Sequence, residues 1–308
     1  MLYDLIILGG GPAGVSAAVY ASRKKLKTLF ITSEFGGQSS VSEKIYNWIG
    51  SPEVGGMELA ENFKKHVTSQ AGEDLEVKEG EKATLVSKKE NNFIVKTESG
   101  TEFEGRTILI STGSGRRKLE AKNADTLEHK GITYCASCDG PLFSGADVAV
   151  IGSGNAGFES AAQLLAYCNS VTLVNRSENF RADEVTVEKV LSHPKMKVIK
   201  NADILEIKGE KFVQGLIYKD KTTGETKELA VTGIFVEIGQ IPNTDLVKDL
   251  VEMDNINRVK IDPWTNRTSI PGIWAAGDCT NILYHQNNIA AGDGVKALED
   301  IYLYLHAK

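Results

Sequence analysis

The feature that most constrains the fold of this chain is an internal repeat of a glycine-rich turn. An apolar run at residues 3–8 enters GGGPAG at 9–14, and a second apolar run at 147–151 enters GSGNAG at 152–157, an offset of 143 residues. Each turn is followed by a helix-like segment and another apolar strand. Because strand, glycine turn, helix and strand recur in the same order, we predict two βαβ units in one chain.

The spacing of the glycines predicts that each turn binds a dinucleotide. In GxGxxG the first glycine makes the turn, the second lets a pyrophosphate approach the backbone, and the third packs the helix against the strand. The free N–H groups and the dipole at the helix N-terminus favour the phosphates. A single turn of this kind also occurs in other α/β proteins, but two in the same context favour two dinucleotides, one retained and one exchanged.

Length, composition and charge limit the class of protein. A chain of 308 residues exceeds the size at which one hydrophobic core usually divides, so we expect two domains. The formal charge of −6 argues against nucleic acid or an anionic membrane as the main partner. No window approaches the roughly 18 apolar residues of a membrane span, and the N-terminus lacks the basic region of a signal peptide. We therefore expect a cytoplasmic protein.

The chain holds four cysteines, and two of them, Cys135 and Cys138, are separated by two residues in YCASCDG. Such a pair is a redox couple, half of a metal site, or two small buried thiols. Zinc usually needs a second pair, whereas Cys168 and Cys279 are isolated, so no metal site is predicted. The spacing favours a redox disulfide, in which the attacking thiol commonly has a lowered pKa.

Further signals indicate that the N-terminal unit holds a flavin. Glu34 ends the second strand, near the position where an acid binds an adenosine ribose, and a solvated surface glutamate is the alternative. Residues 107–113 form a strand that runs into a small-residue turn. Another short strand ends in Gly277 and Asp278, ahead of a helix-like C-terminal segment. A strand that ends in Gly-Asp beside a helix start suits the ribityl and phosphate groups of FAD.

These motifs together resemble a known family. GGGPAG, EFGGQ at 34–38, CASCDG at 135–140, GSGNAG and AAGDCTNILYHQ at 275–286 have the order and spacing of the low-molecular-weight thioredoxin reductases, and the chain is also similar to the C-terminal flavoprotein part of alkyl hydroperoxide reductase. The similarity covers essentially the whole chain. It implies an α/β fold of two Rossmann-like, three-layer dinucleotide-binding domains, the nicotinamide domain being inserted into the FAD domain. The FAD domain is expected at 1–113 and 241–308, and the nicotinamide domain, which carries the CxxC pair, at 114–240.

The resemblance assigns the redox chemistry to three residues. Cys138 is the sulfur that meets the flavin, Cys135 attacks the disulfide of a partner protein through a mixed disulfide, and Asp139 exchanges protons with the dithiol. An aspartate that caps a turn is the alternative for Asp139. The resemblance also implies that one domain rotates against the other and that the protein is a homodimer.

The remaining cofactor contacts carry over by motif. On the FAD side they are Gly9, Gly11, Pro12, Ala13, Gly14, Glu34, Gly37, Gln38, Asn47, Gly113, Gly277, Asp278 and Gln286. On the nicotinamide side they are Gly152, Gly154, Asn155, Ala156, Gly157, Asn175, Arg176 and Arg181. The family often has Arg or Lys just before the glutamine that matches Gln286, where this chain has His285.

The electron donor is predicted from residues 175–181. NADPH-specific members resemble His-Arg-Arg followed by Arg, a cluster that pairs with the 2′-phosphate. This chain keeps Arg176 and Arg181 but has Asn175 and Ser177 at the other two positions. An NADH enzyme would place an acid at the strand end, and Asn175 is not that acid. NADPH is therefore favoured over NADH, with ferredoxin or another flavin donor as the third alternative.

The acceptor is expected to be a separate thioredoxin-like or glutaredoxin-like protein. The alkyl hydroperoxide reductase flavoprotein carries a fused thioredoxin-like N-terminal domain, whereas this chain begins at its first strand. The stretch CDGPLFSG is closer to that flavoprotein, so a peroxiredoxin-linked role stays open. A non-enzymatic flavin redox sensor is the alternative from another class, and no segment resembles the effector domain that it would need. The predicted activity is FAD-dependent reduction of a protein disulfide.

Overall fold

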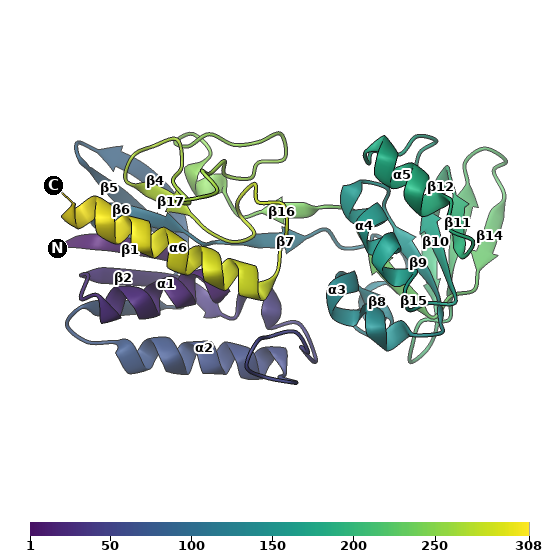
Figure 1. Ribbon diagram of the computed structural model, residues 1–308, viewed down its shortest axis with the longest axis horizontal. Helices are drawn as coiled ribbons and strands as arrows, with labels where there is room; N and C mark the ends of the chain where they lie inside the picture. Colours follow the sequence, from purple (N-terminus) through teal and green to yellow (C-terminus); the bar gives the residue numbers. More distant parts are fainter. Residues whose placement is uncertain (308) are drawn as a thin grey trace. The chain divides into compact units, whose positions relative to one another are not determined.

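The computed structural model describes residues 1–307, which form two compact units (Figure 1). Unit 1 comprises Met1–Gly115 and the chain from Ile241 onward, and unit 2 comprises Arg116–Gln240. Unit 2 is therefore inserted into unit 1. The two crossovers are the short strands β7 (Ser114–Arg116) and β16 (Gln240–Pro242), which pair with each other as a two-stranded ribbon.

Unit 1 is built on a seven-stranded sheet of order β3-β2-β1-β6-β5-β4, in which β17 also pairs with β6. The strands β1, β2, β3, β6 and β17 run parallel, whereas β4 and β5 form an antiparallel hairpin. One edge of β6 is shared, because its first half pairs with β5 and its last residues pair with β17. The bounds are β1 (Leu2–Gly10), β2 (Thr28–Phe35), β3 (Leu75–Glu79), β4 (Ala83–Lys89), β5 (Asn92–Thr97), β6 (Glu102–Ile110) and β17 (Ile273–Ala275).

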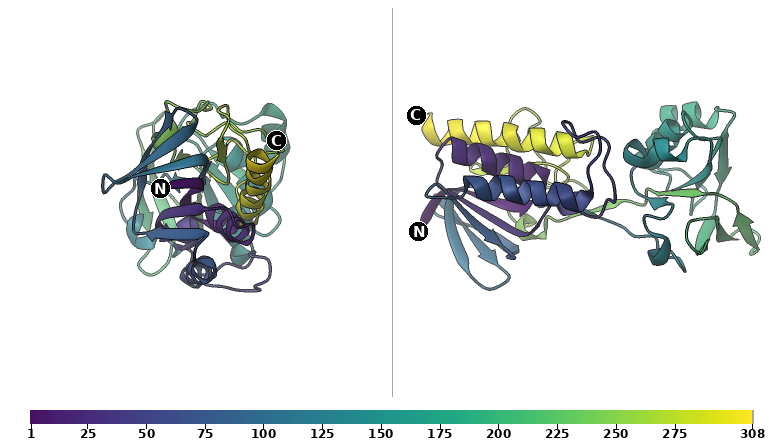
Figure 2. Two further views of the ribbon diagram at one scale, coloured as in Figure 1. Left: turned by 90° about the vertical axis from the view of Figure 1, so that its left-hand side faces the viewer. Right: turned by 90° about the horizontal axis from the view of Figure 1, so that it is seen from below.

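Three helices cover one face of this sheet, as Figure 2 shows, and the other face packs against the hairpin and the segment around Leu246. Alternate residues of β1 point to opposite faces, so Leu5 and Ile7 pack beneath the helices while Ile6 and Leu8 pack on the far side. Short turns η1 (Gly37–Ser39) and η4 (Asp245–Val247) complete the unit. The helices are α1 (Pro12–Arg23), α2 (Gly56–Gln70) and α6 (Asn287–His306).

Unit 2 has a five-stranded parallel sheet of order β11-β10-β9-β15-β8 and a separate antiparallel sheet of β12, β13 and β14. Val148 and Val150 of β9 pack with α4 and α5, whereas Ala149 and Ile151 pack with the antiparallel sheet, which gives three layers. The strands are β8 (Ile132–Thr133), β9 (Asp147–Ile151), β10 (Ser170–Val174), β11 (Met196–Ile199), β12 (Ala202–Lys208), β13 (Gly215–Asp220), β14 (Thr226–Leu229) and β15 (Gly233–Val236). The helices and turns are η2 (Asp125–Leu127), α3 (Ala136–Asp139), η3 (Gly140–Phe143), α4 (Asn155–Leu164) and α5 (Glu184–Leu191).

The two parallel sheets share one topology. In unit 1 the chain runs from β1 outward through β2 and β3, and β6 then pairs with the opposite edge of β1. In unit 2 the chain runs from β9 through β10 and β11, and β15 pairs with the opposite edge of β9. Ligands of open α/β sheets bind at such a reversal of strand order, outside the carboxyl ends of the strands. No helix within residues 1–307 has the length and apolar character to cross a membrane.

Candidate active site

The two glycine turns have the same backbone geometry. The first glycine of each, Gly9 and Gly152, has φ of +116°, which L side chains rarely adopt. A Cβ on Gly9 would lie 2.3 Å from the carbonyl oxygen of Ser111, and a Cβ on Gly152 would lie 2.2 Å from that of Glu237. Both turns therefore press against the strand that follows the reversal of strand order.

The third glycine of each turn packs the helix against the turn itself. A Cβ on Gly14 would lie 1.9 Å from the Gly9 carbonyl oxygen, and one on Gly157 would lie 2.1 Å from the Gly152 carbonyl oxygen. Any larger side chain must push α1 or α4 away from its sheet. This close approach is the role that the GxGxxG spacing predicts for the third glycine.

The second glycine of each turn faces open space. Gly11 and Gly154 are the N-cap residues of α1 and α4, and a Cβ on either would meet no atom within 4 Å. The first N–H groups of both helices thus border room that a phosphate fits. On this observation the residues of both turns are compatible with a bound dinucleotide.

Unit 1 has a cleft of about 540 Å³ around its glycine turn, within the size range of cofactor pockets. Its wall includes one residue that was not predicted, Glu81, which precedes β4. The Oε2 atom of Glu81 is buried without a hydrogen-bond partner, so a donor from a ligand in the cleft would satisfy it. The predicted residues that line the cleft are Gly9, Gly11, Pro12, Ala13, Glu34, Gly37, Gln38, Gly113, Gly277 and Asp278.

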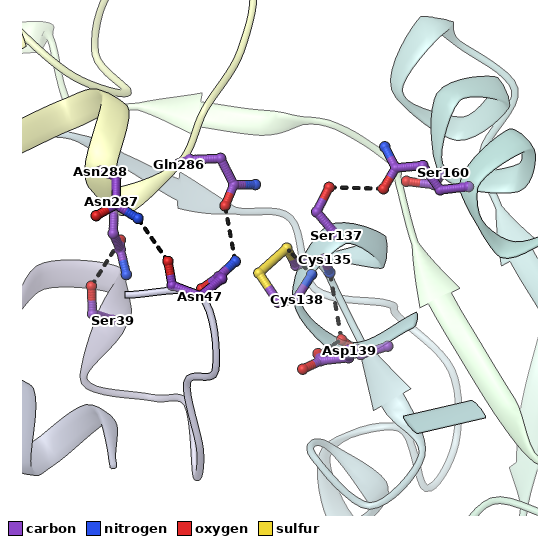
Figure 3. Close-up of a disulfide and its surroundings, with 12 residues drawn as sticks. Ser39, Asn47, Cys135, Ser137, Cys138, Asp139, Ser160, Gln286, Asn287 and Asn288 are labelled. Atoms are coloured by element: carbon purple, nitrogen blue, oxygen red, sulfur yellow. Dashed lines mark hydrogen bonds between the residues drawn. A yellow bond between two sulfur atoms is a disulfide. The ribbon is translucent and has the colours of Figure 1, made fainter. Parts of the chain in front are cut away.

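Three predicted residues of unit 1 do not line this cleft: Gly14, Asn47 and Gln286. The last two meet at the start of α6, where the Asn47 Nδ2 atom donates to Gln286 Oε1 at 3.3 Å (Figure 3). Asn288 Nδ2 donates to the Asn47 carbonyl oxygen at 2.7 Å, and Ser39 Oγ donates to Asn287 Oδ1 at 3.0 Å. These bonds hold the segment that contains Asn47 against the N-terminus of α6. His285, just before Gln286, lies with its Nδ1 atom 3.4 Å from Asp278 Oδ1.

The structure places Asn175 inside its loop, where the cofactor contact predicted for its side chain finds no support. The side chain is 4% exposed, its Oδ1 accepts from Ser153 Oγ at 2.7 Å, and its Nδ2 donates to the carbonyl oxygens of Ser177 and Asn179 at 2.6 and 3.0 Å. Both amide hydrogens are therefore in use. Asn175 shapes the loop that follows β10.

The two arginines of the same loop are exposed at the surface of unit 2. The Arg176 guanidinium is 84% exposed, and its Nε atom lies 3.0 Å from Asp203 Oδ1. Arg181 is exposed too, and its backbone N–H donates to the Ser153 carbonyl oxygen. Glu178 forms an ion pair with Lys200 at 3.0 Å. The loop thus carries two cations, one of them already beside a carboxylate.

Cys135 and Cys138 form a disulfide with a Cα–Cα distance of 5.3 Å (Figure 3). Cys135 is the N-cap residue of α3, and the backbone N–H of Cys138 donates to its sulfur at 3.1 Å. Ser137, between the cysteines, is exposed, and its hydroxyl donates to Gln163 of α4 at 2.8 Å. The redox pair is therefore anchored to the helix that begins at the second glycine turn.

Asp139 directly follows the disulfide and accepts a very short hydrogen bond from the hydroxyl of Thr133. The same hydroxyl accepts from the Cys135 N–H at 3.4 Å, so Thr133 joins the redox loop to the acid. Burial raises the pKa of Asp139, while the Thr133 hydrogen bond and the charges of Arg116 and His129 oppose the rise. A carboxyl in this environment holds its proton to a higher pH than usual.

The other readings of the cysteines can now be judged. Within residues 1–307 no three His, Cys, Asp or Glu side chains converge as a metal would require. Cys168 and Cys279 are buried and unpaired with each other, and burial raises the pKa of both thiols. The paired cysteines are the accessible ones.

The chain was compared with known proteins. The sequence pattern described as pyridine nucleotide-disulphide oxidoreductase matches residues 3–294. The chain is 39% identical over 303 residues to an alkyl hydroperoxide reductase polypeptide, the one designated F, of Staphylococcus aureus (strain MRSA252), a match that covers 98% of this chain and 59% of the relative. It is 38% identical over 303 residues to a protein named NADH dehydrogenase of Bacillus subtilis (strain 168), covering 98% of this chain and 58% of the relative.

A solved structure, that of thioredoxin reductase from Streptococcus pyogenes MGAS5005, is similar with a TM-score of 0.89 and 31% identity, and the match covers 100% of this chain and 99% of the other. The chain therefore belongs to the pyridine nucleotide-disulphide oxidoreductase family, a family of FAD-binding enzymes that use a pyridine nucleotide. The predicted resemblance and the predicted fold class are confirmed. The chain spans somewhat under 60% of the length of the two curated relatives, at 58% and 59%.

Proposed function

We propose that the chain is a disulfide reductase that takes electrons from a reduced pyridine nucleotide, by way of FAD, and passes them through Cys135 and Cys138 to a thioredoxin-like protein. The observation that carries the proposal is the disulfide at α3 in a unit that also holds a complete dinucleotide turn. Thioredoxin reductases of the same fold support it.

Each unit is assigned one cofactor. Unit 1 is proposed to bind FAD, because its cleft lines up the glycine turn, Glu34, Gly277 and Asp278, and because Glu81 presents an unsatisfied oxygen there. Unit 2 is proposed to bind the nicotinamide nucleotide at Gly152, Gly154, Asn155, Ala156 and Gly157. Residues 1–113 with 241–308 and residues 114–240 are thus proposed as the FAD and nicotinamide domains.

When bound, FAD would accept a hydride from the nucleotide and supply an electron pair to the disulfide. Reduction of Cys135–Cys138 breaks the S–S bond and consumes two electrons and two protons, giving two thiols. Asp139 is proposed to hold one of these protons, because its pKa is raised by burial and it lies next to Cys138 in the chain.

The two cysteines are proposed to have different roles. The thiolate of Cys135 is favoured because the Cys138 N–H donates to its sulfur at 3.1 Å. Cys135 therefore attacks the disulfide of the partner, a mixed disulfide forms, and Cys138 then displaces the reduced partner. By the family resemblance, Cys138 is the sulfur that receives the electron pair.

NADPH is proposed as the donor, with NADH as the second candidate. Arg176 and Arg181 are both exposed, and a surface ion pair such as Arg176–Asp203 contributes little, so a 2′-phosphate can replace the carboxylate. NADH is kept because Asn175 is occupied within its loop and because one relative is named NADH dehydrogenase. The matched variants Arg181→Ala and Lys189→Ala, an exposed lysine of α5, separate the two donors. If NADPH is the donor, only Arg181→Ala raises KM for it.

The experiment that tests the proposal follows flavin absorbance without oxygen. NADPH, NADH and reduced ferredoxin are added in parallel to the holoprotein, and oxidised thioredoxin follows. We expect NADPH to bleach the flavin and thioredoxin to restore its colour. Cys138→Ser should still be bleached but should lose protein-disulfide reduction, whereas the control Ser137→Ala should keep both.

Two outcomes contradict the proposal. Retention of thioredoxin reduction by Cys138→Ser would remove the disulfide from the path of electrons. Absence of bleaching by any of the three donors would remove the reductase function, and a flavin redox sensor would then be favoured.

A peroxiredoxin-linked role is the second candidate function. It is favoured by the 39% identity to the alkyl hydroperoxide reductase polypeptide of Staphylococcus aureus. In that case the thioredoxin-like or glutaredoxin-like acceptor would pass electrons to a peroxiredoxin, and addition of peroxide, peroxiredoxin and the acceptor would sustain turnover. By the same resemblance we expect a homodimer, which sedimentation would test.

A further inference from the structure

Glu237 in unit 2 and Ser111 in unit 1 occupy the same place in the two sheets. Each directly follows the strand beyond the reversal of strand order, and each backbone N–H donates to the residue before the glycine turn: Ser111 to Leu8 at 2.9 Å, Glu237 to Ile151 at 2.7 Å. The carbonyl oxygens of both lie behind the first glycine of the turn. The fold thus accepts a small neutral residue here, and unit 2 has an acid.

The carboxylate of Glu237 is held by a second residue that unit 1 lacks. Ser160 of α4 is buried, and its hydroxyl donates to Glu237 Oε1 at 2.6 Å. The residue at the offset of 143 in α1 is Ala17, which is fully buried beside α6 and the sheet. A partly buried carboxyl with a dedicated donor is costly to fold, and the sister turn shows that the turn itself does not require it.

The position of Glu237 indicates which half of a dinucleotide it would meet. The pyrophosphate belongs at Gly154, and the adenosine half belongs beyond the strand that follows the helix, where Asn175 ends β10. The other half then lies across the reversal of strand order, outside β15, and Glu237 is the first residue after β15. Within residues 1–307 only Ser160 donates to this carboxylate, through Oε1 alone.

We propose that the Ser160–Glu237 pair is a binding element for the nicotinamide half of the pyridine nucleotide, in which the carboxylate faces the positive charge of the oxidised ring. The proposal rests on the function proposed above. Reduced nicotinamide is neutral and oxidised nicotinamide is a cation, so an ionised Glu237 stabilises the oxidised form in preference. Glu237 is thereby a residue that favours loss of the hydride.

The charge of Glu237 is set by three neighbours and by its burial. Burial raises the pKa of Glu237 to about 7, with the exposed Glu159 of α4 adding to the rise and the Ser160 hydrogen bond and the charge of Arg116 opposing it. The carboxyl therefore titrates close to neutral pH. A cation that binds beside it releases its proton, so binding of the oxidised nucleotide strengthens as the pH increases.

The test measures the Kd of oxidised nucleotide for the FAD-loaded protein at pH 6, 7 and 8. If only the ionised carboxyl binds the ring, a pKa of about 7 predicts about tenfold tighter binding of NADP⁺ or NAD⁺ at pH 8 than at pH 6. The ligands ADP-ribose and its 2′-phosphate lack the ring, and their Kd should not follow this slope. Calorimetry in two buffers of different ionisation enthalpy counts the proton released.

Three variants separate the binding role from a structural one. Glu237→Gln keeps an acceptor for Ser160 and should bind the oxidised nucleotide more weakly at pH 8, with no slope. Ser160→Ala should move the midpoint of the slope to higher pH, since the Ser160 hydrogen bond lowers the pKa of Glu237. Glu159→Gln removes an exposed neighbouring charge and should leave the slope in place.

The outcomes distinguish this proposal from the one on which it rests. An unchanged slope in Glu237→Gln, or an equal slope for ADP-ribose, overturns the role of Glu237 while leaving nucleotide binding intact. Failure of the wild-type protein to bind any of the nucleotides at any pH overturns the proposed function itself.

Discussion

The two glycine turns are the same structure with different surroundings. Gly9 and Gly152 share a φ of +116°, and the third glycines press against their own turns at nearly equal distances. Beyond the turns the units differ: Ser111 and Ala17 stand where unit 2 has Glu237 and Ser160. What the two units share shows what a dinucleotide turn requires, and what they do not share shows where each unit is adapted to its own ligand.

A second difference lies at the end of the second strand of each unit. In unit 1 this end carries Glu34, an exposed residue on the wall of the cleft. In unit 2 it carries Asn175, whose side chain turns inward to hold its own loop. The adenosine end of unit 2 is therefore shaped by backbone and by exposed arginines rather than by an acid.

The largest effect is expected where the two units are most alike. Gly14→Ala and Gly157→Ala each place a methyl group about 2 Å from a carbonyl oxygen and should each destabilise their own unit by about 3 kcal/mol. All three tryptophans, Trp48, Trp264 and Trp274, belong to unit 1. In denaturant titrations, tryptophan fluorescence should report the loss in Gly14→Ala.

Gly157→Ala is the matched variant, and hydrogen exchange of β9 and β15 should report its effect. The tryptophan signal of Gly157→Ala should keep the wild-type midpoint. Equal loss of both signals in both variants would mean that the two units unfold as one body.

The next effect concerns ligands rather than stability. Gly11 and Gly154 have φ of −77° and −82°, which valine adopts readily, and both face open space. Gly11→Val should weaken FAD binding about 100-fold and leave nucleotide binding to unit 2 intact, because the added side chain fills the place of the phosphate. Gly154→Val should do the reverse. Flavin content and nucleotide titration measure the two effects, and loss of FAD from Gly154→Val would refute the assignment.

A smaller effect is expected in the redox loop, which unit 1 lacks. Thr133→Val removes the hydroxyl that donates to Asp139 and should cost about 1–2 kcal/mol of stability. Because that hydrogen bond lowers the pKa of Asp139, its loss should move the pH profile of acceptor reduction to higher pH. Thr126→Val, which removes an exposed hydroxyl, is the control. An unshifted profile would separate Asp139 from the proton transfer.

The smallest effect is a pH-dependent gain in stability. Below pH 4.5 the Glu237 carboxyl is protonated in both the folded and the unfolded chain, and between pH 4.5 and about 7 only the unfolded chain loses the proton, so stability falls as the pH rises. Glu237→Gln should therefore stabilise unit 2 by about 1–2 kcal/mol at pH 8 and hardly at all at pH 4.5, as hydrogen exchange of β15 would show. Equal gains at both pH values would mean that Glu237 does not titrate in the folded chain.

Short-range patterns predicted much of this molecule. The two glycine turns, the strands that enter them and the helices that follow are local in sequence, so their spacing indicated the fold. The pairing of Cys135 with Cys138 is also local, as is the placing of Asp139 beside it. Asn47 and Gln286, which were assigned by resemblance, meet at the start of α6.

The residues that were missed depend on contacts between distant parts of the chain. Glu237 lies 77 residues from Ser160, and its only signal was an acid that ends the apolar run GIFV. Glu81 lies in a turn with no motif, and only the cleft shows its unsatisfied oxygen. The inward turn of Asn175 was equally hidden, because burial of an amide follows from the loop around it and not from its neighbours in sequence.

The pairing of β7 with β16 has a consequence for how such a chain is assembled. Paired strands lie about 5 Å apart, so the chain leaves unit 1 and re-enters it at almost the same point. Unit 2 therefore behaves as a cassette, and its removal would leave two ends that a tight turn can join. The same property makes this junction a natural place for a gene to gain, lose or exchange a whole domain without disturbing the sheet of its host.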